Sequence, residues 1–141
     1  MSLSVSTREF RSGDYDAAVQ LWTRVDGVEV AEGDSKEDLV SYISRNPHLS
    51  RVAEDGSRIV GAVLCGHDGR RGFIYHLAVE PAYQGKALGR RLVDECLDGL
   101  RRAGIKRALI LVAADNPRGR SFWRASGWED VSGALVMGID L

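Results

Sequence analysis

Residues 73–113 constrain the fold of this chain more than any other segment. Two apolar runs, residues 73–79 and 108–113, stand on either side of one amphipathic stretch. The apolar residues of that stretch recur at helical spacing and make one stripe: Leu88, Leu92, Val93, Cys96, Leu97 and Leu100. A strand, a helix and a second strand in this order predict a crossover between two parallel strands. Because residues 108–113 are apolar on both faces, we expect the second strand to lie in the interior of the sheet.

The rest of the chain predicts antiparallel strands and further helices. Strands are expected at residues 5–11, 49–54, 58–66 and 134–141, and helices at about 15–25, 35–46 and 117–126. Asp34 or Ser35 can cap the second of these helices, and Pro47 stops it. The turn at Asp55-Gly56 is typical of a hairpin. The sequence therefore predicts a mixed α/β (α+β) fold with a central, mostly antiparallel sheet flanked by about four helices.

Size and charge limit the classes of function. The chain has 141 residues, of which 44% are hydrophobic, so we expect one core and a single domain over residues 1–141. With 19 basic and 20 acidic residues, the net charge of -1 disfavours nucleic acid or an anionic membrane as a partner. The longest apolar run, residues 108–114, is far shorter than the roughly 20 residues of a membrane span, and no charged-then-apolar leader opens the chain.

The cysteines argue against a metal site and against a disulfide. Cys65 and Cys96 form no CxxC pair and have no histidine at the spacing of a metal ligand. We therefore expect no metal site and a reduced, cytoplasmic protein.

The turn at residues 84–89, which reads Gln-Gly-Lys-Ala-Leu-Gly, has the features of an anion site. Its small residues leave backbone amides free to point at a ligand, and the positive end of the following helix dipole favours a phosphate there. No G-x-G-x-x-G follows the first expected strand and no GK[ST] occurs, which argues against a dinucleotide site and a P-loop. A tight connection without a ligand is the alternative interpretation.

A second motif follows the turn. After the amphipathic helix and an apolar strand come Asn116, Phe122-Trp123 and Gly127-Trp128. Together with Q-x-x-A-x-G at residues 84–89, this order resembles the GNAT superfamily of acetyl-CoA-dependent N-acetyltransferases, and it is most similar to small bacterial members of that superfamily. The resemblance spans nearly the whole chain. It implies acetyl-CoA as the cofactor and a parallel strand pair that splays apart at the cofactor site.

The resemblance implies a coenzyme A site in three parts. Backbone amides of the turn would hold the pyrophosphate, main-chain groups of the preceding strand would bind the pantetheine arm as an added strand does, and two later side chains would lie beside that arm. The residues of the three parts are Gln84, Gly85, Lys86, Ala87, Leu88, Gly89 and Arg90; Leu77, Ala78 and Val79; and Asn116 and Phe122.

Each part also has an ordinary structural interpretation. Lys86 and Arg90 can be solvated surface charges, and residues 77–79 can be core. Asn116 before a proline is typical of a helix N-cap. Ala87 stands where the resembled family usually has glycine; we expect phosphate binding to survive, although a positive φ at Ala87 would strain the backbone.

The implied reaction sets three tasks, which are to remove an amine proton, to hold an oxyanion and to protonate the departing thiolate. The main-chain amide of Val79 or Leu77 is the candidate for the oxyanion. Tyr75 has the better placement for a base, because His76 lies on the other face of the strand unless a bulge rotates it. Histidine titrates nearer to neutral pH, but a lone strand histidine can also be structural.

Trp123 occupies the position at which many members of the resembled family use tyrosine as the acid. An indole nitrogen donates a hydrogen bond but cannot usefully give up its proton. A thiol with a pKa of about 8.5 leaves near neutral pH with little help, so the tryptophan weakens the case for catalysis without excluding it.

The acceptor is expected near the first helix and the loop after it, because this region covers the acceptor site in the resembled family. The candidate residues are Trp22, Asp26, Glu29 and Glu32. A solvated acidic loop is the alternative interpretation for Glu29 and Glu32. Without a strong base, an α-amine would be easier to acetylate than lysine, because more of it is neutral at pH 7.

Three functions remain open. The first is acetyl transfer from acetyl-CoA to a small-molecule, amino-acid or peptide amine. The second is a non-catalytic acyl-CoA-binding domain, and the third is a nucleotide-binding module of another class. The protein is expected to be a monomer or a homodimer, in which the apolar strand at residues 134–141 would pair with its copy.

Overall fold

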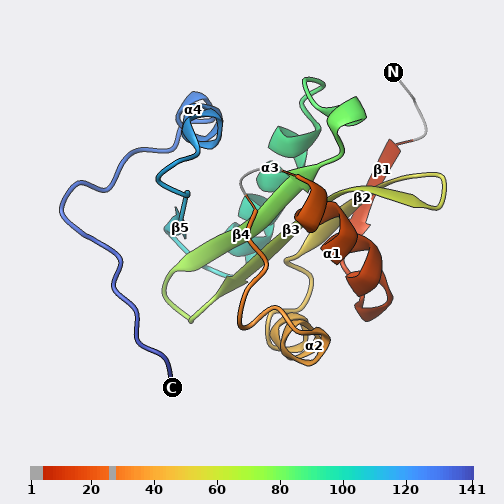
Figure 1. Cartoon of the computed structure of the whole chain (residues 1–141). Coiled ribbons are helices and arrows are strands. Elements are labelled where there is room, and N and C mark those ends of the chain that lie inside the picture. Colours follow the sequence, from red (N-terminus) through yellow and green to blue (C-terminus); the bar gives the residue numbers. More distant parts are fainter. Residues whose placement is uncertain (1–4, 26–27) are drawn as a thin grey trace. The chain divides into compact units, whose positions relative to one another are not determined.

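The computed structural model describes residues 5–25 and 28–141. They fall into two compact units, divided after Leu111. The first unit carries a five-stranded sheet in the order β1-β2-β3-β4-β5 (Figure 1). Within the described ranges the strands are β1 (Val5–Glu9), β2 (Arg51–Asp55), β3 (Arg58–His67), β4 (Gly72–Val79) and β5 (Ala108–Ile110). The α-helices are α1 (Tyr15–Arg24), α2 (Lys36–Arg45), α3 (Leu88–Arg102) and, in the second unit, α4 (Pro117–Ala125).

The pairing of the strands confirms the mixed sheet. β1 to β4 pair antiparallel in sequence order, and β4 pairs with β5 in parallel after the crossover through α3. The expected hairpin turns at Gly56, where φ is 62°. No helix in the described part of the chain combines the length and the apolar character that crossing a membrane requires.

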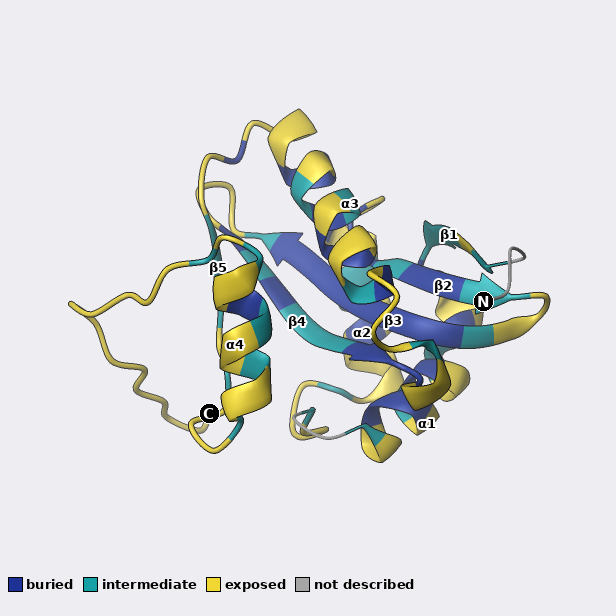
Figure 2. Ribbon diagram, turned by 90° about the horizontal axis from the view of Figure 1, so that it is seen from above, coloured by how far each residue is buried: buried dark blue, intermediate teal, exposed yellow. Residues whose placement is uncertain are grey.

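The side chains of β3 alternate between two cores. Ala62 and Leu64 belong to the cluster that contains Leu21 and Trp22 of α1. On the opposite face, a side chain at Gly61 would meet Leu92 of α3 at 3.0 Å. Helices α1 and α2 therefore cover one face of the sheet and α3 covers the other (Figure 1). β3 lies between these layers and is buried over most of its length (Figure 2).

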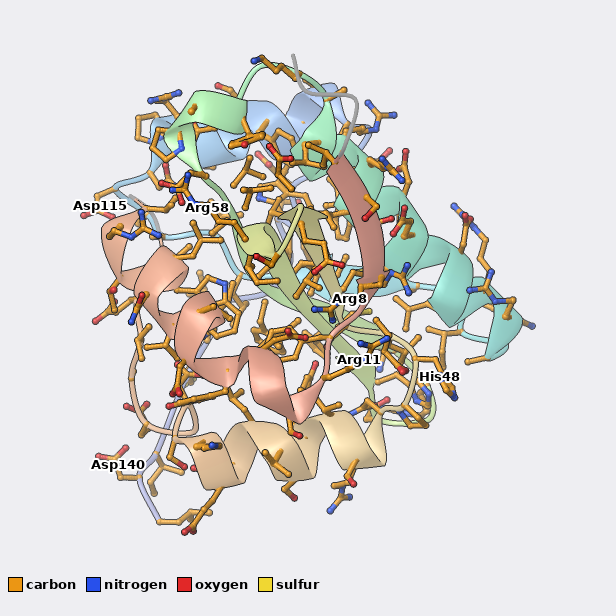
Figure 3. All side chains as sticks on the ribbon, turned by 90° about the vertical axis from the view of Figure 1, so that its right-hand side faces the viewer. Arg8, Arg11, His48, Arg58, Asp115 and Asp140 are labelled. Atoms are coloured by element: carbon orange, nitrogen blue, oxygen red, sulfur yellow. The ribbon has the colours of Figure 1, made fainter. Side chains whose placement is uncertain are left out.

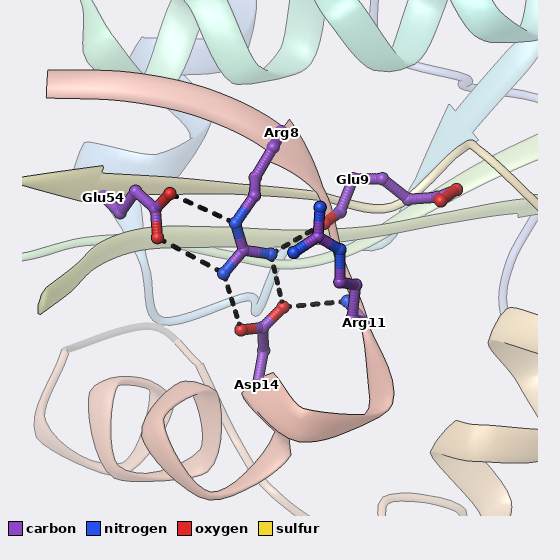
Figure 4. Close-up of polar contacts among 5 residues, drawn as sticks. All are labelled: Arg8, Glu9, Arg11, Asp14 and Glu54. Carbon is purple, nitrogen blue, oxygen red and sulfur yellow. Dashed lines mark hydrogen bonds and ion pairs between the residues drawn. The ribbon is translucent and has the colours of Figure 1, made fainter. Parts of the chain in front are cut away.

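Arg8 joins β1 and β2 to the start of α1. Its guanidinium donates hydrogen bonds of 2.8 and 2.9 Å to the Asp14 carboxylate and of 3.2 and 3.3 Å to Glu54 (Figure 4). Burial acts to raise the pKa of Asp14, but the hydrogen bonds from Arg8 and from the Arg11 amide outweigh it, and the pKa is lowered. This cluster fixes where α1 begins.

The ends of the helices follow the expected signals. The Ser35 side chain caps α2 by accepting a hydrogen bond from the Asp38 amide, and the helix stops before Asn46-Pro47. α3 ends at Ala103-Gly104, where the φ of Gly104 is 82°. In the second unit, the Asn116 side chain accepts from the Gly119 amide at 3.0 Å and caps α4.

The strand expected at residues 134–141 is wrong. The described backbone has no secondary structure there and donates no backbone hydrogen bond, and Leu135, Met137 and Ile139 are 94%, 93% and 88% exposed. A strand exists only where a neighbour pairs with its backbone groups, and an apolar composition does not supply that neighbour.

β5 is shorter and less buried than expected. It pairs with β4 over residues 108–110 only, its residues are half-buried, and Leu111 is 54% exposed. The interior position expected for residues 108–113 is therefore wrong, since β5 is the edge strand of this sheet. Apolar composition alone does not distinguish an edge strand from a central one.

Candidate active site

β4 carries an extra residue near its middle. Leu64 of β3 lies opposite Tyr75, whereas Ala62 lies opposite Ala78, so one more residue of β4 than of β3 lies between these pairs. The backbone of His76 is left-handed at this point, with φ at 56°. An inserted residue of this kind is a β-bulge, which bends the strand and redirects its side chains.

The bulge places His76 on the same face as Tyr75. The imidazole lies 5.1 Å from the Trp22 ring of α1, measured between centroids, and the Tyr75 ring lies 6.5 Å from Tyr42 of α2. Strict alternation would have turned His76 toward α3. The sequence makes His76 a candidate base only if a bulge rotates it, and that bulge is present.

His76 is bonded to a carboxylate that no sequence motif singles out for chemistry. Its Nε2 lies 2.9 Å from Oδ2 of Asp34, and the two side chains are only 17% and 13% exposed. Asp34 lies in the loop before α2, where the sequence predicts at most a helix cap, a role that Ser35 fills. No spacing in the sequence indicates a pair formed across 42 residues.

Tyr75 is less suited to removing a proton. Burial raises the pKa of its phenol above the ordinary value of 10. The ring also stacks on Phe73, with 6.0 Å between centroids. At neutral pH the Tyr75 hydroxyl is therefore a hydrogen-bond donor rather than a base.

The edge of β4 is unpaired beyond the middle of the strand. The parallel pairing with β5 ends at Ile74 and Ile110, while β4 continues to Val79. Among the strands that the structure describes, the main chain of residues 75–79 thus has a neighbour on the β3 side only. An extended ligand can add to such an edge through main-chain hydrogen bonds.

The turn before α3 presents free backbone amides. Arg91 is the first residue whose amide bonds back into the turn, to the Ala87 carbonyl at 3.0 Å. Within the described part of the chain, the amides of residues 85–90 donate to no protein group. Free amides at a helix N-terminus bind anions such as phosphate.

Two residues of this turn have left-handed backbone. Gly85 has φ at 77°, which glycine adopts freely, and Ala87 has φ at 62° directly before α3. The strain that a positive φ imposes on alanine is therefore present here. Glycine, which the resembled family usually has at this position, adopts such a φ without that strain.

The two cations of the turn are exposed and loosely held. Lys86 Nζ is 3.5 Å from the Ala82 carbonyl, and Arg90 Nε is 3.6 Å from Asp94 one helical turn later. Neither contact fixes the charge against the protein. Both side chains are free to reach a ligand or to remain solvated.

Glu80, at the end of β4, is a buried acid that sequence analysis missed. Its Oε1 accepts from Arg24 of α1 at 2.7 Å and lies 3.6 Å from Arg58, labelled in Figure 3. Its Oε2 is buried and has no partner among the described residues. The pair with Arg24 ties the end of α1 to the point where β4 enters the turn.

The acceptor candidates are not equally placed. Trp22 is fully buried, and its Nε1 has no partner among the described residues. Glu29 and Glu32 are exposed in the loop after α1. Asp26 lies outside the described residues.

The second unit holds the remaining candidates. Trp123 packs between Phe122 and Trp128, with ring centroids 5.1 and 5.0 Å away, and is 7% exposed. Asn116 is occupied as the cap of α4. Trp123, packed in this aromatic cluster, thus occupies the position at which the resembled family usually has tyrosine as the acid.

A comparison with known protein families identifies the family to which the chain belongs. The family described as Acetyltransferase (GNAT) family matches residues 15–128. The chain belongs to the GNAT acetyltransferase family. This match covers α1, the bulged strand β4, the turn before α3 and α4.

Similar proteins agree with this assignment. An acetyltransferase of Sodalis glossinidius is 29% identical over 93% of this chain and 92% of its own length. An acetyltransferase of Pectobacterium atrosepticum is 33% identical over 77% of each chain. Among solved structures, the PaiA N-acetyltransferase of Thermoplasma acidophilum, in complex with coenzyme A, has a TM-score of 0.76 at 22% identity, covering 93% of this chain and 94% of that one.

Family membership identifies the general chemistry. Members transfer an acyl group to an acceptor substrate, so this GNAT protein is an acetyl-transferring enzyme by family. The predictions of fold class and family are confirmed. The predicted site residues stay predictions.

Proposed function

We propose that this GNAT protein is an N-acetyltransferase that moves the acetyl group of acetyl-CoA to a primary amine by direct attack. The acceptor is a small molecule, an amino acid or a peptide amine. Residues 1–141 act as one cytoplasmic domain, as a monomer or a homodimer. The similar Thermoplasma protein is an N-acetyltransferase in complex with coenzyme A, and this supports both the cofactor and the amine acceptor proposed here.

The observation that carries the proposal is the run of amides at residues 85–90 that donate to no described group, beside an edge of β4 at residues 75–79 that pairs with no described strand. A pyrophosphate needs several donors and a positive dipole, and the N-terminus of α3 supplies both. A pantetheine arm carries amides that pair as a strand does, and the free edge of β4 accepts such pairing. The residues present therefore fit the group. Lys86 and Arg90 add positive charge at the turn.

The main chain of β4 serves the transition state. When the amine nitrogen bonds to the acetyl carbon, negative charge builds on the acetyl oxygen. A backbone amide of Leu77 or Val79 would stabilise this charge, because an amide that is already oriented needs no reorganisation. Asn116 and Phe122 of the second unit would contact the pantetheine arm.

His76 is the better of the two candidate bases. Its side chain is partly buried and bonded to a carboxylate, whereas the Tyr75 phenol stays protonated at neutral pH because burial raises its pKa. Trp22, Asp26, Glu29 and Glu32 would line the acceptor site. Trp123 supplies no acid, so the thiolate would leave without one.

Calorimetry with acetyl-CoA tests the cofactor site. The wild type should bind, and Lys86→Glu should raise the Kd about 10-fold, equivalent to ~1.4 kcal/mol, by placing negative charge at the turn. Lys106→Glu is the matched control, because Lys106 is an exposed lysine outside the turn, and it should leave the Kd within about 2-fold. Absence of binding by the wild type would overturn the proposal.

Thiol release tests the reaction. Acetyl-CoA and a panel of α-amines, polyamines and lysine peptides should release free coenzyme A with at least one amine, and α-amines should react faster than lysine because more of them are neutral. A specific observation supports a second candidate function, a non-catalytic acyl-CoA-binding domain, because Trp123 is packed into an aromatic cluster and offers no acid. Binding without release for any amine would favour that function.

A further inference from the structure

We infer that Asp34 is a positioning residue that fixes the tautomer of His76, so that Nδ1 is the ring nitrogen left to accept the proton of the acceptor amine. The amine chemistry in this inference rests on the proposed function. The tautomer does not, and it can be measured without any substrate.

The hydrogen bond between the two side chains determines the tautomer. His76 Nε2 lies 2.9 Å from Asp34 Oδ2. An ionised carboxylate only accepts hydrogen bonds, so Nε2 must carry a proton. In the neutral ring the lone pair is then on Nδ1. Nδ1 has no hydrogen-bond partner in the described part of the chain, so no described protein group competes for its lone pair.

Asp34 is itself held in place from two sides. Its Oδ2 also accepts from the Ala31 amide at 3.0 Å, and its main-chain carbonyl accepts from the Tyr15 hydroxyl of α1 at 3.0 Å. The carboxylate is therefore fixed relative to α1 and cannot follow the imidazole if the ring turns. A fixed acceptor is what a residue that orients another side chain requires.

A second contact holds the ring from its other side. The Trp22 ring lies 5.1 Å from the imidazole at an interplanar angle of 56°. Trp22 is fully buried, so it provides a rigid wall. With one nitrogen bonded to Asp34 and one side packed on Trp22, the imidazole has little freedom to exchange its two nitrogens.

The backbone is strained in this arrangement. A left-handed backbone is strained for histidine, and residues strained in this way cluster at functional sites. Without the bulge, β4 would keep regular alternation and His76 would point toward α3. The bulge and the positive φ of His76 are thus what bring the ring to Asp34.

The proton and electron balance of the step is simple. The amine nitrogen forms a bond to the acetyl carbon and gives one proton to Nδ1 of His76. The carbon–sulfur bond breaks, and its electron pair leaves on the sulfur. Asp34 then stabilises the imidazolium, as the acid of a Ser-His-Asp triad does for its histidine.

Nitrogen NMR of the full chain tests the tautomer directly. The chain has three histidines, and a His76→Asn sample identifies the resonances of His76. In the neutral ring, the wild type should show a protonated Nε2 and an unprotonated Nδ1. Asp34→Asn should give a mixture of tautomers, because an amide can donate as well as accept. A protonated Nδ1 in the wild type, or an unchanged tautomer in Asp34→Asn, would overturn the inference.

Steady-state kinetics test the role in transfer. Asp34→Asn should lower kcat about 10- to 100-fold and leave the KM for acetyl-CoA within about 2-fold, since a misplaced base affects the chemical step. Glu37→Gln is the matched control, because Glu37 is an exposed acid at the start of α2, and it should keep wild-type kcat. A raised acceptor KM with unchanged kcat in Asp34→Asn would show that Asp34 only anchors the loop, and would overturn the inference.

Failure of the inference and failure of the proposed function give different results. A wild type that transfers acetyl groups while Asp34→Asn retains full kcat refutes the positioning role and leaves the proposed function intact. A wild type that binds no acetyl-CoA refutes the proposed function and with it the role of Nδ1 in transfer, whatever tautomer the spectra show. Urea unfolding of Asp34→Asn confirms that a loss of kcat does not come from loss of the fold.

Discussion

The side-chain amide of Gln84 donates a hydrogen bond of 2.8 Å to the main-chain carbonyl of Val79. This bond joins the end of β4 to the start of the turn before α3. The two halves of the proposed coenzyme A site, the strand edge and the amide turn, are thereby held at a fixed separation.

Gln84→Ala should loosen that connection. A hydrogen bond of this kind contributes about 1 kcal/mol. We therefore expect the free energy of unfolding to fall by about 1 kcal/mol and the Kd of acetyl-CoA to rise about 5-fold. Calorimetry and urea unfolding measure the two effects. Gln20→Ala, at an exposed glutamine of α1, serves as the control. Unchanged affinity in Gln84→Ala would show that the bond does not shape the site.

Ala87→Gly should stabilise the protein. The alanine has φ at 62°, a conformation that costs about 1 kcal/mol for a residue with a Cβ and almost nothing for glycine. The gain is reduced by the greater freedom of glycine in the unfolded chain, so we expect an increase of up to ~0.5 kcal/mol. Ala17 is an exposed residue of α1, and Ala17→Gly should instead destabilise the protein by about 1 kcal/mol. Urea unfolding compares the two, and a loss of stability in both would contradict the prediction.

Arg8→Met should destabilise the protein more at neutral than at acidic pH. Asp14 has a lowered pKa when folded, so its ion pair contributes stability above the ordinary carboxyl pKa of about 4, and that contribution is lost as the pH falls through the folded pKa. The pair is only partly exposed, so its loss should cost about 2 kcal/mol at pH 7 and less at pH 3. Arg45→Met, at an exposed arginine of α2, should show a small effect at both pH values. A cost independent of pH would argue against the ion pair as its source.

Cys65 and Cys96 should resist thiol reagents in the native protein. A hydrogen bond with Cys65 and burial raise the pKa of the Cys96 thiol, and both side chains are fully buried. The thiolate is the reactive form, so an Ellman assay should find no fast-reacting thiol until denaturant is added, and both thiols afterwards. One equivalent of rapid reaction in the native state would contradict the prediction.

Trp123→Tyr should raise turnover if the missing acid limits the reaction, while the affinity for acetyl-CoA stays the same. Tyrosine restores the acid that the resembled family uses. An acid of this kind raises the rate at most about 100- to 10,000-fold. Thiol-release kinetics and calorimetry separate the two quantities. Trp128→Tyr, the same exchange at the neighbouring ring of the cluster, is the control. An unchanged rate in Trp123→Tyr would mean that protonation of the thiolate is not limiting.

Much of the fold could be predicted because its signals are local. The stripe from Leu88 to Leu100 predicted α3. Asp34-Ser35 and Asn116 marked the starts of α2 and α4, and Ser35 is the residue that caps α2. The turn at residues 84–89 predicted free amides from small residues alone. These features depend on periodicity and capping, which neighbouring residues determine by themselves.

The sequence by itself determined the crossover, the amide turn and the family to which they belong. Only the tertiary structure decided that β5 is an edge strand, that residues 134–141 form no strand and that His76 meets Asp34. These outcomes depend on strand partners and on a one-residue bulge, and a one-residue shift turns a side chain to the other face of a sheet. Such contacts join segments far apart in the chain, so no local pattern carries them.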